Sequence, residues 1–248
     1  MTVTKSNGID VLDTNAARTY THIHPVLVLS GYFLAFPYVV ANPISSLSTL
    51  LIPLSILQVI YVVLCLPATG TPTSSKAHKK TSKGKNETSL FNRVTVGIPR
   101  ARRVVLPSLL RRLQPAIISL TLSLFLGTPL LTALLILFGA PLTTHIPHTA
   151  LCAAHISLLT SLPLIYVYGV ETDKWRRIAA LMVPVDEVFG AAVGGCLGAW
   201  VGAVPIPLDW DREWQRWPVT IVTGAFLGWA VGKTAGGMLK GKLIDLSP

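Results

Sequence analysis

Few acidic residues in this chain could do chemistry, and three of them gather in one short stretch. Asp209, Asp211 and Glu213 alternate along the sequence beside Arg212 and Arg216, in a chain with only 11 Asp and Glu among 248 residues. Alternating carboxylates can hold a divalent cation through oxygen ligands, or act in acid–base catalysis. However, no His stands near them, and no Ser or Cys stands beside a base. An ion-paired turn joining two helix ends is the more economical interpretation, so we predict no catalytic residue, no metal site and no cofactor.

Other polar residues of interest lie within or beside apolar segments. His145 and His148 share a short turn but lack a third ligand, so they do not predict a zinc site. Lys233 lies near the end of an apolar segment, where its stem can snorkel to the membrane surface; contact with a lipid phosphate is a second interpretation. Asp186 and Glu187 precede another apolar segment, where carboxylates complement the positive end of a helix dipole.

Two apolar segments carry a glycine at every fourth position. Each glycine of the second row follows its counterpart in the first by 34 positions. The rows are Gly190, Gly194, Gly198 and Gly202, then Gly224, Gly228, Gly232 and Gly236. This spacing places each row on one helical face, and in lipid a face without side chains lets another backbone approach closely. Two interpretations of this glycine zipper stay open: the rows pack against each other, or one row stays available for a helix of another protein.

The connection between the two glycine-rich segments is aromatic. It holds three of the six tryptophans, and tryptophan prefers the boundary between membrane and water. Its residues of interest are Pro207, Asp209, Trp210, Asp211, Arg212, Trp214, Gln215, Trp217 and Pro218. The segments and their connection therefore predict a membrane hairpin with an aromatic loop at the membrane surface.

Composition assigns the whole chain to the membrane. Apolar residues make up 51% and charged residues 13%, against about 25% charged in an ordinary soluble domain. Six segments are long and apolar enough to be read as spans: 25–41, 47–66, 115–140, 149–170, 188–205 and 218–239. The predicted fold is all-α, with six transmembrane helices arranged as three hairpins. Gly127-Thr128-Pro129 is the predicted kink, and the three cysteines are predicted to be packing residues.

The distribution of basic residues predicts the orientation. Of the 21 Lys and Arg, 18 fall on one side of the predicted spans and two on the other. Positive charge marks the cytosolic side, so both termini are predicted to be cytosolic and the aromatic loop to face the lumen or exterior. The net charge of +10 is thereby explained as a topology and lipid-surface signal, and no nucleic-acid partner is predicted.

This orientation divides the chain into seven parts. They are a cytosolic tail (1–24), hairpin 1 (25–66), a basic, partly disordered cytosolic loop (67–112), hairpin 2 (113–170), a cytosolic linker (171–186), the glycine-ladder hairpin 3 with its lumenal loop (187–240), and a cytosolic tail (241–248). Within the basic loop, Thr69 to Thr88 is predicted to be disordered, and Asn86 to stay unglycosylated because it is cytosolic. Arg100 to Arg112 is either a short segment lying on anionic headgroups or plain topogenic charge.

The third hairpin resembles the C-terminal hallmark of the PIG-F family, in a fungal-type form. The resemblance rests on the runs GAWVGA (198–203), PIPLDWDR (205–212) and WQRWP (214–218), and covers roughly residues 187–240. One departure is Glu213, where proline is expected in many relatives. The first 186 residues agree with the family in the number of spans and in lacking a soluble domain, but carry no motif of it.

The resemblance implies a role that composition does not. PIG-F proteins are multi-pass membrane proteins of the endoplasmic reticulum that act in the biosynthesis of glycosylphosphatidylinositol (GPI) anchors. They are partner subunits that stabilise the large catalytic GPI ethanolamine phosphate transferase, which transfers ethanolamine phosphate to mannose. The implied partners are that transferase and membrane lipids, with the GPI precursor and phosphatidylethanolamine as candidates. The alternative is a lipid transferase or lipid transporter acting through Asp209, Asp211 and Glu213.

Overall fold

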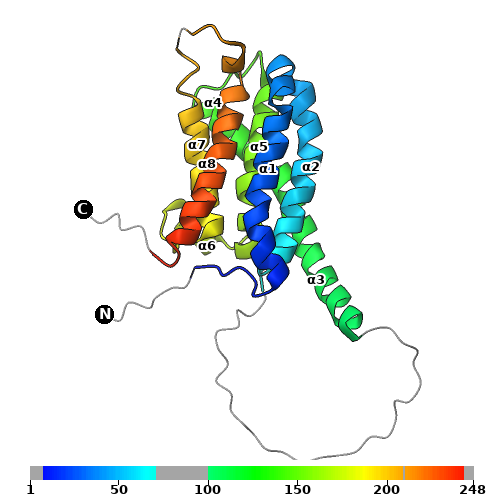
Figure 1. Cartoon of the computed structure of the whole chain (residues 1–248). Helices are drawn as coiled ribbons and strands as arrows, with labels where there is room; N and C mark the ends of the chain where they lie inside the picture. Colours follow the sequence, from blue (N-terminus) through cyan, green and yellow to red (C-terminus); the bar gives the residue numbers. More distant parts are fainter. Residues whose placement is uncertain (1–7, 71–99, 209, 243–248) are drawn as a thin grey trace, which may run out of the picture.

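A computed structural model describes residues 8–70, 100–208 and 210–242, and the regular secondary structure of this part of the chain is all helical, without strands (Figure 1). The helices are α1 (Asn15–Ala41), α2 (Pro43–Cys65), α3 (Arg100–Leu122), a π-helical turn η1 (Ser123–Gly127), α4 (Thr128–Leu137), α5 (Ile146–Tyr168), α6 (Thr172–Ala179), α7 (Glu187–Gly202), a 3₁₀ turn η2 (Glu213–Gln215) and α8 (Val219–Met238). The predictions for Asn86 and the loop around it lie outside the described residues, as does Asp209.

Four helical stretches are long and apolar enough to cross a membrane: 15–41, 43–65, 109–137 and 146–168. α7 is a shorter apolar helix of 16 residues, and α8 runs beside it with 20. The predicted all-helical membrane fold is thus confirmed in its class. The count of six membrane crossings and the cytosolic placement of both termini stay predictions.

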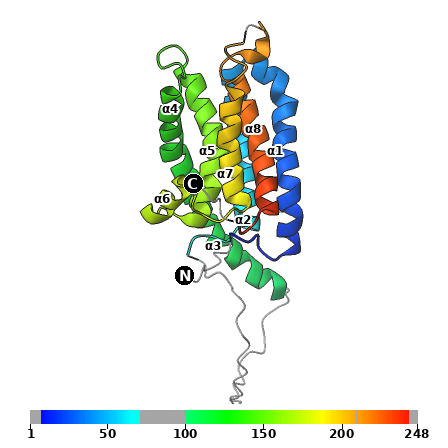
Figure 2. The same ribbon diagram turned by 90° about the vertical axis from the view of Figure 1, so that its left-hand side faces the viewer.

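α5 is the central helix of the bundle. In its most apolar window 78% of the residues are buried, against 6% in the corresponding window of 109–137. α5 packs against α2, α3, α4, α7 and α8, whereas α1 packs mainly against α2. The long helices run along one common axis, with the short α6 at one end (Figures 1 and 2). The apolar side chains of α5 therefore form the core on which the remaining helices are placed.

Both ends of the described chain lie at the same end of the bundle, opposite the connection between α7 and α8 (Figure 1). The backbone N–H of Ile9 donates to Asp186 at 2.9 Å, and that of Val185 donates to the carbonyl of Lys242 at 2.8 Å. The segment that precedes α7 thus holds the start and the end of the described chain together. This arrangement is the one that the distribution of basic residues predicted.

The predicted irregularity near Pro129 is present as a π-helical turn, Ser123–Gly127, directly before α4. Proline has no N–H for the preceding turn, so the helix cannot continue with regular hydrogen bonds there. The side chain of Ser157 on α5 donates to the carbonyl of Ser123 at 2.7 Å. The wider turn thereby gains a partner from the central helix.

Three features differ from the prediction. α1 begins at Asn15, ten residues before the predicted span, because Thr14 caps it by accepting from the N–H of Ala17 at 3.1 Å. The basic stretch Arg100 to Arg112, interpreted either as a short segment on anionic headgroups or as topogenic charge, is the first half of α3, continuous with the apolar half and projecting beyond the bundle (Figure 1). α6 was not predicted, since its eight residues are too few and too charged to show an apolar segment.

Candidate functional site

The two glycine rows face each other across the contact between α7 and α8. A Cβ atom built at Gly198 would fall 2.8 Å from the Cα of Gly228 and closer still to the carbonyl oxygen of Gly224. Added Cβ atoms at Gly190, Gly194, Gly202, Gly232 and Gly236 would likewise meet backbone atoms of the opposite segment. α7 and α8 are accordingly the most closely packed helices of the bundle. The faces that meet leave no room for a third helix. At this contact the two glycine rows therefore pack against each other, which was the first of the two interpretations.

The edges of the same glycines stay accessible along one side of the helix pair. A groove of 560 Å³, which we call the α7–α8 groove, follows the contact between the two helices. Its walls include Val193 and Val201 on α7, and Leu227 and Val231 on α8. The glycines leave backbone as its floor. The groove lies at the outside of the bundle, because Val201 and Val231 in its walls are 56% and 68% exposed. The side chains that line it are apolar.

Gln215 organises the aromatic loop at the far end of α7 and α8. Its side-chain amide donates to the carbonyls of Pro205 and Leu208, at 2.7 and 2.8 Å, and its carbonyl accepts from the N–H of Arg212 at 2.9 Å. One side chain thus satisfies three backbone groups that no helix pairs. The sequence placed Gln215 in this loop but gave no sign of its role.

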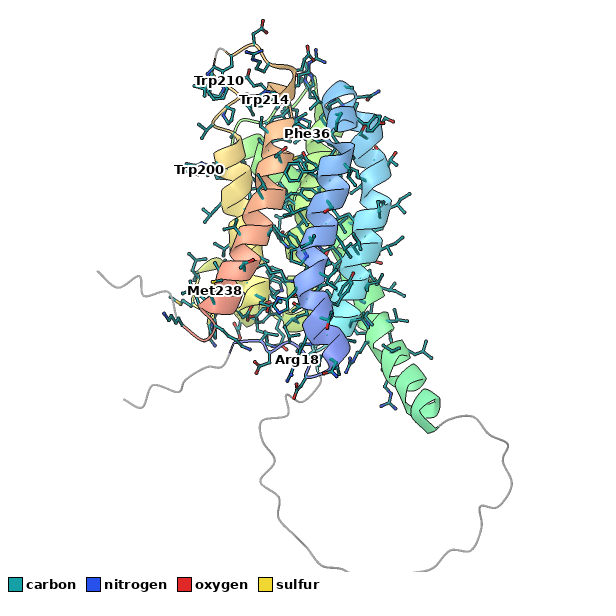
Figure 3. All side chains as sticks on the ribbon, viewed as in Figure 1. Arg18, Phe36, Trp200, Trp210, Trp214 and Met238 are labelled. Atoms are coloured by element: carbon teal, nitrogen blue, oxygen red, sulfur yellow. The ribbon has the colours of Figure 1, made fainter. Side chains whose placement is uncertain are left out.

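Trp210 and Trp214 of the loop lie at one end of the molecule (Figure 3). The rings of Trp210 and Trp214 are 5.7 Å apart, and Trp210 is 52% exposed. Trp217 donates through Nε1 to Thr149 Oγ1 at 3.2 Å, which ties the start of α8 to the start of α5, and its peptide bond to Pro218 is cis. The predicted aromatic loop is therefore folded, with the indole of Trp210 exposed and those of Trp214 and Trp217 partly buried, as the boundary of a membrane favours.

Among the described residues, the carboxylates of the loop do not gather into a cation site. Glu213 pairs with Arg216, three residues later, in the predicted ion-paired turn. Asp211 is exposed, with a positive backbone φ of 48°. Among the described residues no group of three His, Cys, Asp or Glu could hold a metal ion. The rings of His145 and His148 lie 5.1 Å apart and have no third ligand there.

Asp186 closes the opposite end of the helix pair as the N-cap of α7. Its Oδ1 accepts from the N–H groups of Val188 and Phe189, at 2.9 and 2.8 Å, and its Oδ2 accepts from Ile9 and from the hydroxyl of Tyr168. Burial raises the pKa of Asp186, and these hydrogen bonds oppose the rise. The sequence-based interpretation of this residue as a helix-start carboxylate is confirmed.

Lys233 points into the bundle, so both interpretations of its side chain were wrong. It is 4% exposed; its Nζ donates to the carbonyl of Thr21 at 3.0 Å and lies 3.9 Å from the centre of the Tyr61 ring. Thr21 donates in turn to Glu187 at 2.9 Å, and His24 stacks on Tyr61 with ring centres 4.4 Å apart. Thr21 and His24 come from α1 and Tyr61 from α2. These residues are far from Lys233 in the sequence, so the sequence alone did not show their contacts.

Comparison with known proteins identifies the family. The model of "GPI biosynthesis protein family Pig-F" matches residues 23–237. The chain belongs to the Pig-F family. It is 42% identical to "Glycosylphosphatidylinositol anchor biosynthesis protein 11" of Aspergillus fumigatus, over 97% of this chain and 86% of that protein. It is 41% identical to the protein of that name from Neurospora crassa, over 93% of this chain and 78% of the other. No solved structure matches it.

Another Pig-F relative is a fusion. The "PIGF/3-ketodihydrosphingosine reductase fusion protein" of Schizosaccharomyces pombe is 42% identical over 48% of this chain and 24% of its own length. The resemblance read from the third hairpin is thus confirmed, and it extends over most of the chain. As a member of the Pig-F family, this membrane protein takes part in GPI-anchor biosynthesis.

Proposed function

We propose that this protein is a non-catalytic, multi-pass subunit of the endoplasmic reticulum membrane. In this role it binds and stabilises the GPI ethanolamine phosphate transferase, and so supports transfer of ethanolamine phosphate to mannose of the GPI precursor. Membership of the Pig-F family supports the pathway. The observation that carries the specific role is the α7–α8 groove, an apolar surface of backbone and small side chains on the outside of the bundle.

The groove suits a membrane helix of a partner protein. α7 has 16 residues, so the groove extends over about 24 Å at 1.5 Å per residue. Its floor of glycine backbone lets a partner helix come close, and close approach is what drives helix association in lipid. The glycines of α7 and α8 thus act twice in this proposal: their faces join the two helices, and their edges shape the surface for the transferase.

The aromatic loop has a supporting place in the proposal. Gln215 and Trp217 hold it against the ends of α5, α7 and α8, so it presents a fixed surface at the membrane boundary. We place this surface on the lumenal side, where the large catalytic domain of the transferase would stand above it. Glu213 is paired with Arg216 and so is engaged in holding the turn rather than poised as a base.

Substitution in the groove tests the proposal. Val231→Trp fills the groove without entering the contact between α7 and α8, because Val231 is 68% exposed there. Leu130→Trp on α4 is the matched control, since Leu130 is also 68% exposed but does not line the groove. We expect Val231→Trp to lower the amount of transferase that co-purifies in mild detergent about ten-fold, which corresponds to about 1.4 kcal/mol.

The control decides what a loss means. Leu130→Trp should retain the full complex, and both variants should reach the membrane in equal amounts. If Val231→Trp also retains the full complex, the groove is not the contact surface. If both variants lose the transferase equally, the loss follows from an added indole in the membrane and not from the groove.

A further inference from the structure

A second cavity lies between α4 and α7, beside the aromatic loop. It measures 590 Å³, within the range of 300–1,000 Å³ that is usual for ligand sites. Leu135 on α4 and Ala199 on α7 form two of its walls, and Ile156 of α5, 3% exposed, belongs to its lining. α4 and α7 both pack against α5 but not extensively against each other. Figure 2 shows them on either side of α5, and the lining residues Phe138 and Trp200 are 75% and 65% exposed, so the cavity opens at the surface of the bundle.

The size and lining of this cavity decide between occupants. The cavity measures 590 Å³, a volume usual for a small ligand, and Ile156 of the central helix belongs to its lining. Water would find few hydrogen-bond partners, because the lining side chains are apolar except for the thiol of Cys196 and the indole N–H groups of Trp200 and Trp217, and that of Trp217 donates to Thr149. A narrow, flexible and apolar group that enters from the membrane fits both constraints. An acyl chain is such a group.

The charges near the mouth select the lipid. The cavity reaches Pro207 and Trp217 of the aromatic loop and Pro141 of the connection between α4 and α5. The loop between α7 and α8 holds two arginines and three carboxylates in sequence, and the connection between α4 and α5 holds no Lys or Arg. An anionic headgroup is attracted by an excess of Lys and Arg, whereas the carboxylates of this loop outnumber its arginines. A headgroup with both a phosphate and a cation finds partners of both signs.

From these observations we propose that the cavity between α4 and α7 binds one acyl chain of a membrane phospholipid whose headgroup carries no net charge. The headgroup lies at the aromatic loop and the chain follows the cavity toward the middle of the membrane. This lipid site is separate from the α7–α8 groove and does not depend on the proposed binding of the transferase. Small side chains such as Ala199 and Ala203 keep the space open.

Photocrosslinking tests the site. The full chain is placed in nanodiscs that contain phosphatidylcholine with a diazirine in one acyl chain, irradiated, and mapped by mass spectrometry. Ala199 lines the cavity and is 8% exposed. The control position is Ile52 on α2, which is 67% exposed but lies outside the cavity. A bound chain should label Ala199 and Leu135 about ten-fold more than Ile52. Labelling that simply follows exposure would overturn the proposal.

A pair of alanines separates filling of the cavity from a general effect. Ala203→Phe fills the cavity, and Ala235→Phe adds the same ring in the α7–α8 groove. We expect labelling at Ala199 to fall about ten-fold in the first variant and to stay unchanged in the second. Equal labelling of Ala199 in both variants would contradict the site.

The cavity can also be filled after folding, which removes any doubt about misfolded variants. Cys196 is exposed and lines the cavity, whereas Cys65 and Cys152 are buried. Alkylation of the folded protein with N-cyclohexylmaleimide should therefore modify Cys196 and abolish the labelling of Ala199. Unchanged labelling after complete alkylation would overturn the proposal.

A comparison of lipid headgroups tests the proposal that the headgroup carries no net charge. Phosphatidylserine with the same diazirine chain should label Ala199 several-fold less than phosphatidylcholine does. Equal or stronger labelling by phosphatidylserine would refute the headgroup assignment. Labelling by phosphatidylcholine that disappears whenever a purified partner protein is bound would show that the partner, and not a lipid, occupies the cavity in the complex.

Discussion

Asp186 is the residue on which the closed end of the α7–α8 pair depends. One carboxylate accepts hydrogen bonds from the backbone of Ile9, Val188 and Phe189 and from the hydroxyl of Tyr168. It therefore joins the start of the described chain, the end of α5 and the start of α7. The sequence predicted a carboxylate at a helix start that complements the helix dipole, and the structure shows in addition that Asp186 is the N-cap. Its bonds to Ile9 and Tyr168 need the folded bundle and could not be read from the chain.

The raised pKa of Asp186 predicts a dependence of stability on pH. Burial raises its pKa above the ordinary value of 3.8, so between that value and the raised pKa the folded state keeps a proton that the unfolded state loses. Stability must then fall as the pH rises through this window. We expect the Tm of the purified protein to decrease across it, and Asp186→Asn to flatten that decrease. Asp173→Asn, in an exposed ion pair with Arg176, should leave the decrease unchanged.

Lys233 provides a second prediction at this scale. Lys233→Met keeps the aliphatic stem but removes the ammonium that donates to Thr21 and lies over the ring of Tyr61. We expect a loss of about 1–3 kcal/mol in the free energy of unfolding. Lys240→Met is the control: it breaks an exposed ion pair with Asp10, which is worth about 0–1 kcal/mol. Measured in detergent by thermal unfolding, equal effects of the two variants would contradict a structural role for the buried ammonium.

The α7–α8 pair is the element that the sequence described best. Its eight glycines show their spacing directly, and a spacing of four on a helix can only form one face. The spacing does not show what the face contacts. Packing against the other glycine-rich helix of this chain and packing against a helix of another protein require the same residues. The structure shows the first kind of packing through the backbone contacts at Gly198, Gly224 and Gly228. The outer groove then follows from the glycine edges.

Two glycines in different helices make this contact testable. Gly198→Ala places a Cβ against the backbone of Gly224 and Gly228, so α7 and α8 must separate. We expect destabilisation of about 3 kcal/mol, the upper end for overpacking. Gly31→Ala on α1 meets nothing within 4 Å, so the higher helix propensity of alanine should leave stability equal or raise it by up to about 1 kcal/mol. Equal unfolding temperatures for the two variants would show that the rows do not pack closely.

Elements without an apolar or periodic signal were the ones missed. α6 has eight residues, among them Asp173, Lys174, Arg176 and Arg177, and no run of apolar side chains marks it. Gln215 was placed in the loop from the sequence, but its hydrogen bonds to the backbone of Pro205, Leu208 and Arg212 form only in the folded loop. The cavity between α4 and α7 exists only because both helices stand on α5 at a distance from each other. Such features depend on contacts between distant segments, which one sequence does not reveal.

At the scale of the molecule, the described part of the chain has two distinct ends, and the α7–α8 groove and the cavity between α4 and α7 are apolar openings on it. The basic end holds the start and end of the described chain, and the aromatic end holds the loop between α7 and α8 (Figures 1 and 3). The α7–α8 groove and the cavity between α4 and α7 lie on neighbouring faces of α7, and Leu197 lines both. In the two proposals a partner helix lies in the groove and a lipid chain in the cavity.

The central claim is that the chain maintains the transferase and leaves the chemistry to it. The most direct test measures, in cells depleted of this protein, both the amount of transferase and its turnover per transferase molecule. The account predicts that the amount falls while the turnover of the remaining molecules stays the same. It also predicts full rescue by a chain in which Asp209, Asp211 and Glu213 are replaced by Asn, Asn and Gln. An unchanged amount of transferase with lost turnover, or failure of that carboxylate-free chain to restore turnover, would contradict the claim.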